Sequence, residues 1–590
     1  MKKAGRIVSL FSAAAMLLST AGITAFAQQE SSRKEKSVSE MVAEMTTEQK
    51  LEQMIMISLR KWTDSGSDGL KDVTSLNDAQ RKLIQEHNFG GVCLFAQNIH
   101  DTEQIAALTN EMQQAALDSE CGIPMLLSAD QEGGSIYRLA TGTPTCGNMA
   151  LGAANDPELA RKNAEIIGSE LKAVGINTNF APVLDVNCNP SNPVINIRSF
   201  SSDADIVSSL GAGYIAGLKD EGVITTSKHF PGHGDTNVDS HTGLPLIDKT
   251  YDELKKTELA PYAVNALNSD MVMTAHIQFP KIETQTYISK LDGKPIMLPA
   301  TLSKKVITDI LRNDYKFSGV VITDSMVMNA IASHFDPVDA AVLAINAGVD
   351  IILEPMTINT EKSIAELEEY IEAITEKVTD GTIKEETVND AVTRILTLKK
   401  QRGILDFTPA DAEKALKIVG CDEHRETALE VAEKAVTLVK NDNDLLPLDL
   451  GADGKAAYFY PYDNVKNTME FALTRLKKDG TISENVSAVC NCYQDHKASE
   501  YEETVKDCDV VIVSLEMYRA ANIDKNDPRG WQAVFCDDMI ELAHKTPFLM
   551  AASMASSTSA LAVASVLEMR TCTLYFSVPS SLLLGLNTFT

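Results

Sequence analysis

The sequence lacks an excess of positive charge. Its 53 lysine and arginine residues are outnumbered by 82 aspartate and glutamate residues, which gives a formal net charge of −29 over 590 residues. Nucleic acids and anionic membranes bind to basic surface patches, because both carry dense negative charge. The composition therefore excludes nucleic acid as a partner, and we expect no membrane insertion of the mature chain.

The ten cysteines lack the spacing of a metal site. The pair Cys490-x-Cys492 has no second pair that would complete a zinc-binding pattern. Most cysteines are expected to be small buried side chains, as in Val92-Cys93-Leu94. The cysteines therefore predict no zinc site, and they permit disulfides without requiring them.

The N-terminus lacks an apolar run long enough for a convincing membrane span, but it has the features of a secretory signal. Three basic residues within the first six precede the apolar residues 7–21, and Ala25-Phe26-Ala27 is a small-x-small cleavage pattern. We predict a signal peptide over residues 1–27 and a flexible tether over residues 28–39. These segments predict a secreted, extracellular bacterial protein.

The last forty residues lack charge. Between Ala551 and Thr590 only Glu568 and Arg570 are charged, whereas the 23% average of the chain predicts about nine such positions. Serine, alanine, threonine and leucine dominate without a helical or alternating period. We predict that residues 551–590 are an altered end that leaves the preceding domain incomplete.

The chain contains a regular alternation of strand-like and helix-like segments over residues 40–405. One helix is marked by Asp336 as N-cap, Pro337 in the first turn and Gly348 at its end. Eight strands alternating with helices predict a (β/α)8 barrel. An open doubly wound sheet is the alternative, and polar residues after nearly every strand argue against it. The predicted strands are residues 54–58, 91–95, 125–128, 178–186, 222–227, 271–276, 319–323 and 350–353.

A smaller α/β domain is predicted to follow the barrel. An amphipathic helix over residues 383–402 ends the barrel, and residues 406–424 form a linker. The second domain, over residues 425–550, has no comparable cluster of catalytic groups, so we assign it a supporting role. Its predicted elements are a helix to Ala435 and strands at 436–439, 456–460, 509–515 and 547–550.

Polar side chains follow the predicted barrel strands. The carboxyl ends of the strands of such a barrel meet at one rim, where enzymes of this fold place their active sites. Cations and anions converging on one rim predict a pocket for a polar small molecule. The groups at the strand ends are Arg60, Asp130, Arg138, Asp185, Arg198, Lys228, His276, Asp324 and Glu354.

The densest group of titratable side chains lies in residues 227–241, with the sequence SKHFPGHGDTNVDSH. Pro231 and Gly232 exclude a helix, because proline lacks an amide donor and glycine lowers helix stability. A polar loop after a buried strand is typical of an active site in an α/β enzyme. A metallohydrolase that uses His229, His233, His241 and the loop aspartates as ligands is one alternative, although a loop cannot present the helical His-x-x-x-His face.

Several long motifs resemble glycoside hydrolase family 3 and, within it, the β-N-acetylglucosaminidase branch. The motifs, which cover the whole barrel in the right order, are DQEGG with Arg138, FAPVLDVN, NPVINIRSF, KHFPGHGDTNVDSH and VITDSM. The resemblance implies a retaining glycosidase on a (β/α)8 barrel, a carbohydrate substrate with a terminal GlcNAc, and no cofactor. Some secreted Gram-positive members add a C-terminal α/β domain, which agrees with the length of this chain.

The resemblance also implies roles for individual residues. Asp324 falls at the position of the nucleophile, which forms a covalent glycosyl-enzyme. Asp239 and His241 fall at the positions of an acid/base pair that replaces the second carboxylate of most retaining glycosidases. His233 and Asp235 are expected to brace the loop. The residues expected to bind sugar hydroxyls are Asp130, Arg198, Lys228 and His229, with Arg138 and Arg60 as further candidates.

Some alternatives stay open. Arg60 either faces an acidic leaving group such as N-acetylmuramic acid or is a surface charge. A catalytically weak carbohydrate-binding protein is a further alternative, against which the joint presence of Asp239, His241 and Asp324 argues. A β-glucosidase is disfavoured, because such family members lack the Asp-x-His pair. Muropeptides, chitooligosaccharides and glycan-linked GlcNAc all present the same terminal sugar, and the first would imply peptidoglycan turnover at the cell wall.

Overall fold

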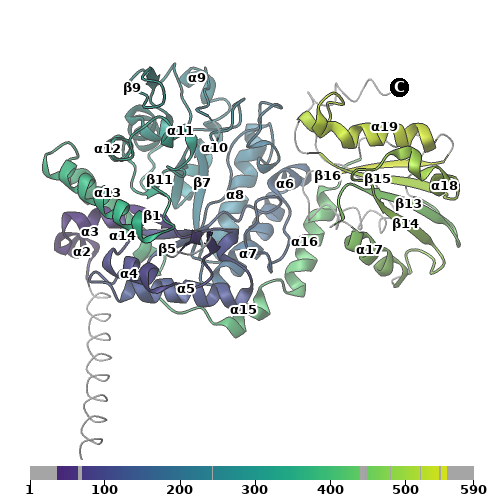
Figure 1. The fold of residues 1–590 in the computed structure, drawn as a ribbon, viewed down its shortest axis with the longest axis horizontal. Helices are drawn as coiled ribbons and strands as arrows, with labels where there is room; N and C mark the ends of the chain where they lie inside the picture. The colour runs from purple at the N-terminus through teal and green to yellow at the C-terminus, as the bar shows by residue number, and fades with distance from the viewer. Residues whose placement is uncertain are drawn as a thin grey trace, which may run out of the picture.

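The computed structural model describes residues 36–553, except 64–68, 242, 439–440, 442–445, 447, 464–465, 479, 518–519 and 544–545. Two large parallel β-sheets, each covered by helices, lie one beyond the other along the longest axis (Figure 1). The predicted signal peptide, most of the predicted tether and residues 554–590 of the atypical tail lie outside the described residues.

The larger sheet has eight strands in the order β11-β8-β7-β6-β5-β4-β1-β12. All pairs within it are parallel. A bridge between Ile322 of β11 and Ile351, next to β12, joins the two ends of this order and closes the sheet. The predicted (β/α)8 barrel is therefore confirmed. Its strands are β1 (Ile55–Ser58), β4 (Gly91–Leu94), β5 (Leu126–Ala129), β6 (Thr178–Asn179), β7 (Ile224–Phe230), β8 (Met271–Thr274), β11 (Val320–Ile322) and β12 (Ile352–Leu353).

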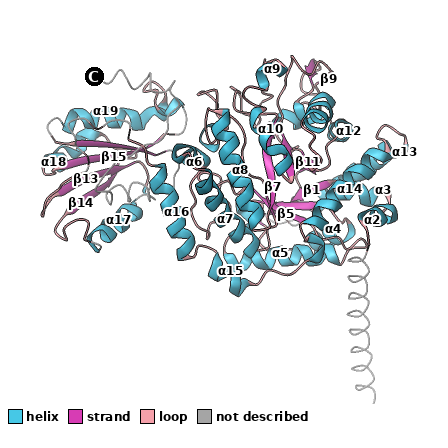
Figure 2. Cartoon of the chain, turned by 180° about the vertical axis from the view of Figure 1, so that it is seen from behind, coloured by secondary structure: helices cyan, strands magenta, loops and turns pink. Residues whose placement is uncertain are grey.

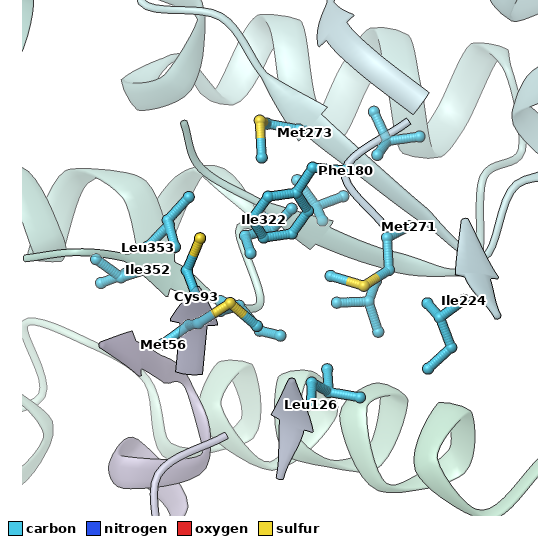
Figure 3. Packing of buried hydrophobic residues seen from close by; sticks show 14 of the residues in the cluster. Met56, Cys93, Leu126, Phe180, Ile224, Met271, Met273, Ile322, Ile352 and Leu353 are labelled. Carbon is cyan, nitrogen blue, oxygen red and sulfur yellow. The ribbon is translucent and has the colours of Figure 1, made fainter. Parts of the chain in front are cut away.

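The interior of the barrel is filled by apolar side chains from these strands and by Phe180, which directly follows β6 (Figure 3). Met56, Phe180 and Met271 are fully buried, and Cys93 is 1% exposed, as its apolar neighbours predict. Each such side chain contributes about 1.5–3 kcal/mol of burial free energy. The barrel is therefore a packed core, and binding chemistry is left to the ends of its strands.

Helices cover the outside of the barrel (Figure 2). The predicted helix after Asp336 is α12: the Asp336 side chain accepts from the Val338 amide, and Gly348 ends the helix at φ +107°. The predicted helix over 383–402 is α14, which buries Val388 and Ile395. The barrel helices are α2 (Val38–Glu44), α3 (Thr47–Gln53), α4 (Asp78–Glu86), α5 (Thr102–Leu117), α6 (Asn148–Ala154), α7 (Pro157–Ala173), α8 (Ala204–Asp220), α9 (Tyr251–Leu254), α10 (Ala260–Asn265), α11 (Asn329–Ala332), α12 (Pro337–Ala347), α13 (Glu361–Thr379), α14 (Glu385–Gln401) and a π-helix at Lys305–Asp314.

Strand β7 is longer than its sequence predicts. Its apolar part ends at Ser227, but the strand continues to Phe230 because both neighbouring segments keep pairing with it. Lys228 forms a bridge with Val183 on one side, and Phe230 pairs with Thr274 on the other. The polar residues Lys228 and His229 therefore lie on the strand itself, and the loop begins only at Pro231.

The smaller sheet has the order β14-β13-β15-β16, and all its pairs are parallel. The strands predicted near 456, 509 and 547 are confirmed. The strand predicted at 436–439 is wrong over its described residues, 436–438, where Val436 packs against the sheet as part of the connection. The elements of this domain are β13 (Lys455–Tyr460), α17 (Lys466–Lys478), β14 (Ser487–Cys492), α18 (Glu502–Lys506), β15 (Val510–Glu516), α19 (Trp531–Ala543) and β16 (Phe548–Ser553).

Two helices, α15 (Ala412–Ile418) and α16 (Asp422–Ala435), connect the barrel to the second domain. They pack against barrel helices, α15 on α5 and α7, and α16 on α6 and α7. The buried carboxylate of Glu170 accepts hydrogen bonds from the Gly420 amide and from His424 Nδ1, each at 2.9 Å. The connection is thus tied to the barrel by polar as well as apolar contacts.

Over the part of the chain that the structure describes, we find no helix that combines the length and apolarity of a membrane span. The nine cysteines in that part are all free thiols.

Candidate active site

Three of the predicted sugar-binding residues meet in one ion-pair network at the rim of the barrel. Lys228, on β7, places its Nζ 2.6 Å from Asp130 Oδ1 and 2.7 Å from Glu132 Oε1. Arg198 binds Glu132 through two bonds, Nε to Oε2 at 2.9 Å and Nη2 to Oε1 at 2.7 Å. Only 1% of the Lys228 side chain is exposed, so its ammonium group is held almost entirely by protein oxygens.

Glu132 is the centre of this network, and it is not among the site residues that the sequence predicts. Burial opposes ionisation of its carboxyl group, but Arg198 and Lys228 outweigh burial and hold its pKa well below the usual range. The signal in the sequence is its place two residues after Asp130 in DQEGG, a spacing that puts both side chains on one side of an extended segment. Glu132 fixes both cations in place and leaves their remaining donors for a ligand.

His229 is oriented by the buried carboxylate of Asp185. Its ring Nδ1 donates to Asp185 Oδ2 at 2.7 Å, and its amide donates to Oδ1 at 3.2 Å. Burial raises the pKa of Asp185, while His229 and His233 lower it by a larger amount, so this carboxyl group is ionised. A carboxylate on Nδ1 fixes the tautomer of the ring and leaves Nε2 for other contacts.

His233 braces the loop from inside, as its position in the motif predicts. Its amide donates to Asp185 Oδ1 at 2.6 Å, Nδ1 lies 2.9 Å from Thr236 Oγ1, and Nε2 lies 3.3 Å from Ser240 Oγ. Burial, together with the charge of His229, lowers the pKa of His233 to about 4. The ring is therefore neutral near pH 7. Asp235, the other expected brace, pairs with Lys249 at 2.8 Å.

Asp324 lies directly after β11. The Ser325 amide donates to its Oδ1 at 2.7 Å. Burial raises the pKa of Asp324, but electrostatic interactions with His229, His276 and Lys228 and the hydrogen bond from the Ser325 amide lower it below its ordinary value. The Asp324 carboxyl group is therefore ionised, and the cation Lys228 stabilises its negative charge, which suits a nucleophile.

His276 supports the same turn from β8. Its Nε2 lies 3.0 Å from the Ser325 carbonyl oxygen, and its Nδ1 lies 2.8 Å from Thr301 Oγ1. Burial lowers the pKa of His276. The sequence places this histidine at a strand end but indicates no role for it, because its partners Thr301 and Ser325 lie far away in the chain.

Asp239 and His241 form a pair on the loop after β7. Asp239 Oδ1 accepts from both the amide and the ring Nδ1 of His241, each at 2.8 Å. The His241 side chain is 63% exposed, whereas His229 and His233 are buried. The imidazole thus faces solvent while a carboxylate orients it.

Arg138 and Arg60 differ in their surroundings. Arg138 Nη2 lies 3.9 Å from Asp130 Oδ2, next to the sugar-binding network. Arg60 Nη2 contacts both carboxylate oxygens of Glu354 at 2.8 Å, and its guanidinium lies over the Phe95 ring at 3.3 Å. Arg60 therefore belongs to a separate ion pair and cation–π contact at the ends of other strands.

The three histidines of residues 227–241 do not form a ligand set. Each ring already has its own protein partner: Asp185 for His229, Thr236 for His233 and Asp239 for His241. Within the described residues, the donor groups close enough together to hold an ion are Glu48, Glu52 and His87, and Cys188, Asp235 and Glu258. The second set contains the loop aspartate Asp235, but neither set contains His229, His233 or His241, so the geometry does not favour the metallohydrolase alternative.

Comparison with known proteins identifies relatives of this chain. Residues 46–398 match the model of the glycosyl hydrolase family 3 N-terminal domain. The chain is 36% identical over 482 residues to β-hexosaminidase A of Pseudoalteromonas piscicida. The aligned region covers 80% of this chain and 79% of that protein. The β-hexosaminidase of Tolumonas auensis is 33% identical over 47% of this chain and 79% of its own length. The structure of a family 3 β-N-acetylglucosaminidase from Paenibacillus sp. str. FPU-7 superimposes with a TM-score of 0.73 at 32% identity, over 90% of this chain and 97% of that one.

Proposed function

This chain belongs to glycosyl hydrolase family 3 and is a glycoside hydrolase of the β-N-acetylhexosaminidase type, and we propose that it removes terminal β-linked GlcNAc residues by a retaining mechanism. The observation that carries the mechanism is the buried carboxyl group of Asp324 near the end of β11, which accepts a hydrogen bond from the Ser325 amide and whose pKa is lowered. The Asp239–His241 pair on the neighbouring loop supplies the second group that a double displacement needs.

In the first step, Asp324 attacks the anomeric carbon. The bond between this carbon and the glycosidic oxygen breaks as the bond to the Asp324 carboxylate forms. The protonated imidazole of His241 gives its Nε2 proton to the departing oxygen, which leaves as an alcohol. Asp239 stabilises the imidazolium and holds its orientation through Nδ1.

In the second step, a water molecule takes the place of the alcohol. Neutral His241 accepts a proton from the water as its oxygen attacks the anomeric carbon, and the bond to Asp324 breaks. Two inversions at one carbon leave the sugar with its original β configuration.

The terminal sugar is bound in this proposal by the network around Glu132. Asp130 accepts from sugar hydroxyls, Lys228 and Arg198 donate to them, and His229 contributes Nε2. Arg138 adds a donor beside Asp130. Arg60 is already neutralised by Glu354, so we assign it at most a weak contact with an acidic leaving group.

We propose muropeptides or chitooligosaccharides as substrates of a secreted form of the enzyme, because the sequence of residues 1–27 has the features of a signal peptide. The test is a panel of aryl β-GlcNAc, β-glucoside and β-xyloside substrates with the purified protein. We expect the β-GlcNAc substrate to be cleaved with the highest kcat/KM. A preference for the β-glucoside would contradict the proposal.

The activity is expected to persist in EDTA and to follow a bell-shaped pH profile. The acidic limb comes from protonation of Asp324 and lies at low pH, because the pKa of that group is lowered. The alkaline limb comes from loss of the His241 proton, since the first step needs an acid. The measurement is kcat/KM against pH with and without chelator. Activity lost in EDTA and restored by zinc would favour the metallohydrolase.

Inorganic phosphate is expected to compete with water for the glycosyl-enzyme. A glutamate as base would repel an incoming anion by about 4 kcal/mol at 4 Å in a partly desolvated site, whereas neutral imidazole would not. Asp130 and Glu132 offset much of the charge of Lys228 and Arg198, so hydrolysis should stay the main route. Product analysis in rising phosphate should detect some GlcNAc-1-phosphate. Its absence, with an unchanged rate, would leave His241 as a proton carrier only.

A further inference from the structure

The segment that carries His241 is hydrogen-bonded to the segment that carries Asp324. Asn329 Nδ2 donates to the His241 carbonyl oxygen at 2.8 Å. The amide of Ala330, the next residue, donates to the Ser240 carbonyl oxygen at 3.2 Å. Both donors lie in α11, which begins five residues after Asp324.

The position of Asn329 is set by the turn that follows Asp324. The Met326 amide donates to the Leu353 carbonyl at 2.9 Å, and the Met328 amide donates to the Ser325 carbonyl at 3.2 Å. Met326 and Met328 are 5% and 7% exposed, so the turn is packed as well as bonded. The start of α11 therefore moves with the turn that holds Asp324.

The orientation of the Asn329 amide group is also defined. The Ser333 hydroxyl donates to Asn329 Oδ1 at 3.4 Å, one helical turn further on. This contact identifies the oxygen side of the amide and directs Nδ2 towards the His241 carbonyl. Because Nδ2 is the donor to the His241 carbonyl oxygen, replacing Asn329 by aspartate, which has no such donor, would remove this hydrogen bond.

His241 needs such a tether because its hydrogen bonds to Asp239 are local. Its ring and amide bind Asp239, two residues away in the same loop, and 63% of its side chain is exposed. These bonds orient the imidazole within the loop but do not fix its distance from Asp324. The bonds from Asn329 and Ala330 connect the loop to the turn of Asp324.

We propose that Asn329 is a positioning residue that holds the acid/base His241 at its working distance from the glycosidic oxygen. This inference rests on the proposed role of His241. Proton transfer requires a heavy-atom distance of about 2.6–3.2 Å, and a displacement of about 1 Å can lower the rate by about 100-fold. Asn329 acts through the His241 backbone and touches neither substrate nor reacting atoms.

The test compares two substrates that share a terminal β-GlcNAc and differ in their leaving group. The dinitrophenolate of 2,4-dinitrophenyl β-GlcNAc leaves without being protonated, whereas the leaving sugar of chitobiose needs a proton. The value of kcat/KM reports the first chemical step for both. For Asn329→Ala and for the isosteric Asn329→Asp, which cannot donate, we expect a loss of about tenfold on chitobiose and less than about twofold on the dinitrophenyl substrate.

Asn346 provides a matched control. Its exposed side chain also donates through Nδ2 to a backbone carbonyl of another segment, Thr382, at 3.0 Å. Asn346→Ala should therefore leave both substrates unchanged. An unchanged thermal midpoint in each variant would show that the folds are intact, and Asn329→Asp serves if the alanine variant does not fold.

Equal losses on the two substrates, or no loss on either, would overturn the inference. His241→Ala is measured alongside to separate it from the proposed function. If His241→Ala loses activity selectively on chitobiose while the Asn329 variants do not, the positioning role fails and the acid/base assignment stands. If His241→Ala shows equal losses, both fail.

Discussion

Asp324→Ala is expected to lower kcat by about 10⁴-fold or more, because the covalent step then has no nucleophile. The fold should persist, since the turn around Asp324 is held by backbone bonds of Met326 and Met328. The measurement is kcat on an aryl β-GlcNAc together with the circular dichroism of the variant. Asp252→Ala is the control, because that side chain is 88% exposed on α9 and should leave kcat unchanged.

A second experiment identifies the carboxylate that attacks the anomeric carbon. A mechanism-based 5-fluoro analogue of a β-GlcNAc donor should label the wild-type enzyme on Asp324, as found by peptide mass. Sodium azide should restore turnover of Asp324→Gly and yield the α-glycosyl azide, because a small anion can occupy the vacated position. Near-normal activity in Asp324→Ala, or a label on another carboxylate, would refute the assignment.

Glu132→Gln is expected to have the second largest effect, on stability and on binding together. Glu132 is 2% exposed and balances the charges of Lys228 and Arg198. Removing one partner of a buried ion pair costs about 3–5 kcal/mol, because the remaining charges are left uncompensated. We expect the free energy of unfolding to fall by about that amount and kcat/KM to fall by about 100-fold, since both cations lose their anchor.

The fluorescence of a single tryptophan can report the change in the free energy of unfolding. The chain has two, Trp62 in the barrel and Trp531 in the second domain, so Trp531→Phe leaves the buried Trp62 as the reporter of barrel unfolding. In this background, Glu366→Gln is the control. It removes one partner of an exposed pair with Lys362 and should change stability by less than about 0.5 kcal/mol.

The effect of Glu132→Gln should depend on pH with a defined sign. Because the pKa of Glu132 is lowered on folding, its contribution to stability is fully present above the unfolded pKa of about 4.3 and is lost as pH falls towards the folded value. The difference between wild type and variant should therefore be constant near pH 7 and shrink below about pH 4. A difference that grows at low pH would contradict the assignment of Glu132 as the buried anion.

The barrel could be predicted from the sequence because its strands are short, apolar and buried on both sides. Runs such as that of β11, with Val320 and Ile322, give an unmistakable signal. The sequence of strand β14 gives no such signal, because it contains Ser487, Cys490 and Asn491 and its side chains are half-buried or exposed at the sheet edge. The end of β7 was misplaced for a related reason: Lys228 and His229 are polar, and only their pairing with the neighbouring strands keeps them in the sheet.

Residues of the candidate site could be predicted where they lie at strand ends or in the long motifs. Asp324 and Lys228 could be placed at the candidate site because the carboxyl ends of all strands meet at one rim. Glu132 was missed as a centre because its partners lie 66 and 96 positions away in the chain, and only the fold brings them within bonding distance. No feature of the sequence marks Asn329 as a site residue, because its proposed role depends on the His241 carbonyl oxygen in another loop.

The most direct test of a retaining mechanism is the configuration of the first product. Proton NMR during the first minutes of turnover of an aryl β-GlcNAc resolves the α and β anomers of the released sugar before they interconvert. The account predicts that β-GlcNAc appears first and that the α anomer grows in later at the rate of mutarotation. Initial release of α-GlcNAc would mean a single displacement and would contradict a covalent intermediate on Asp324.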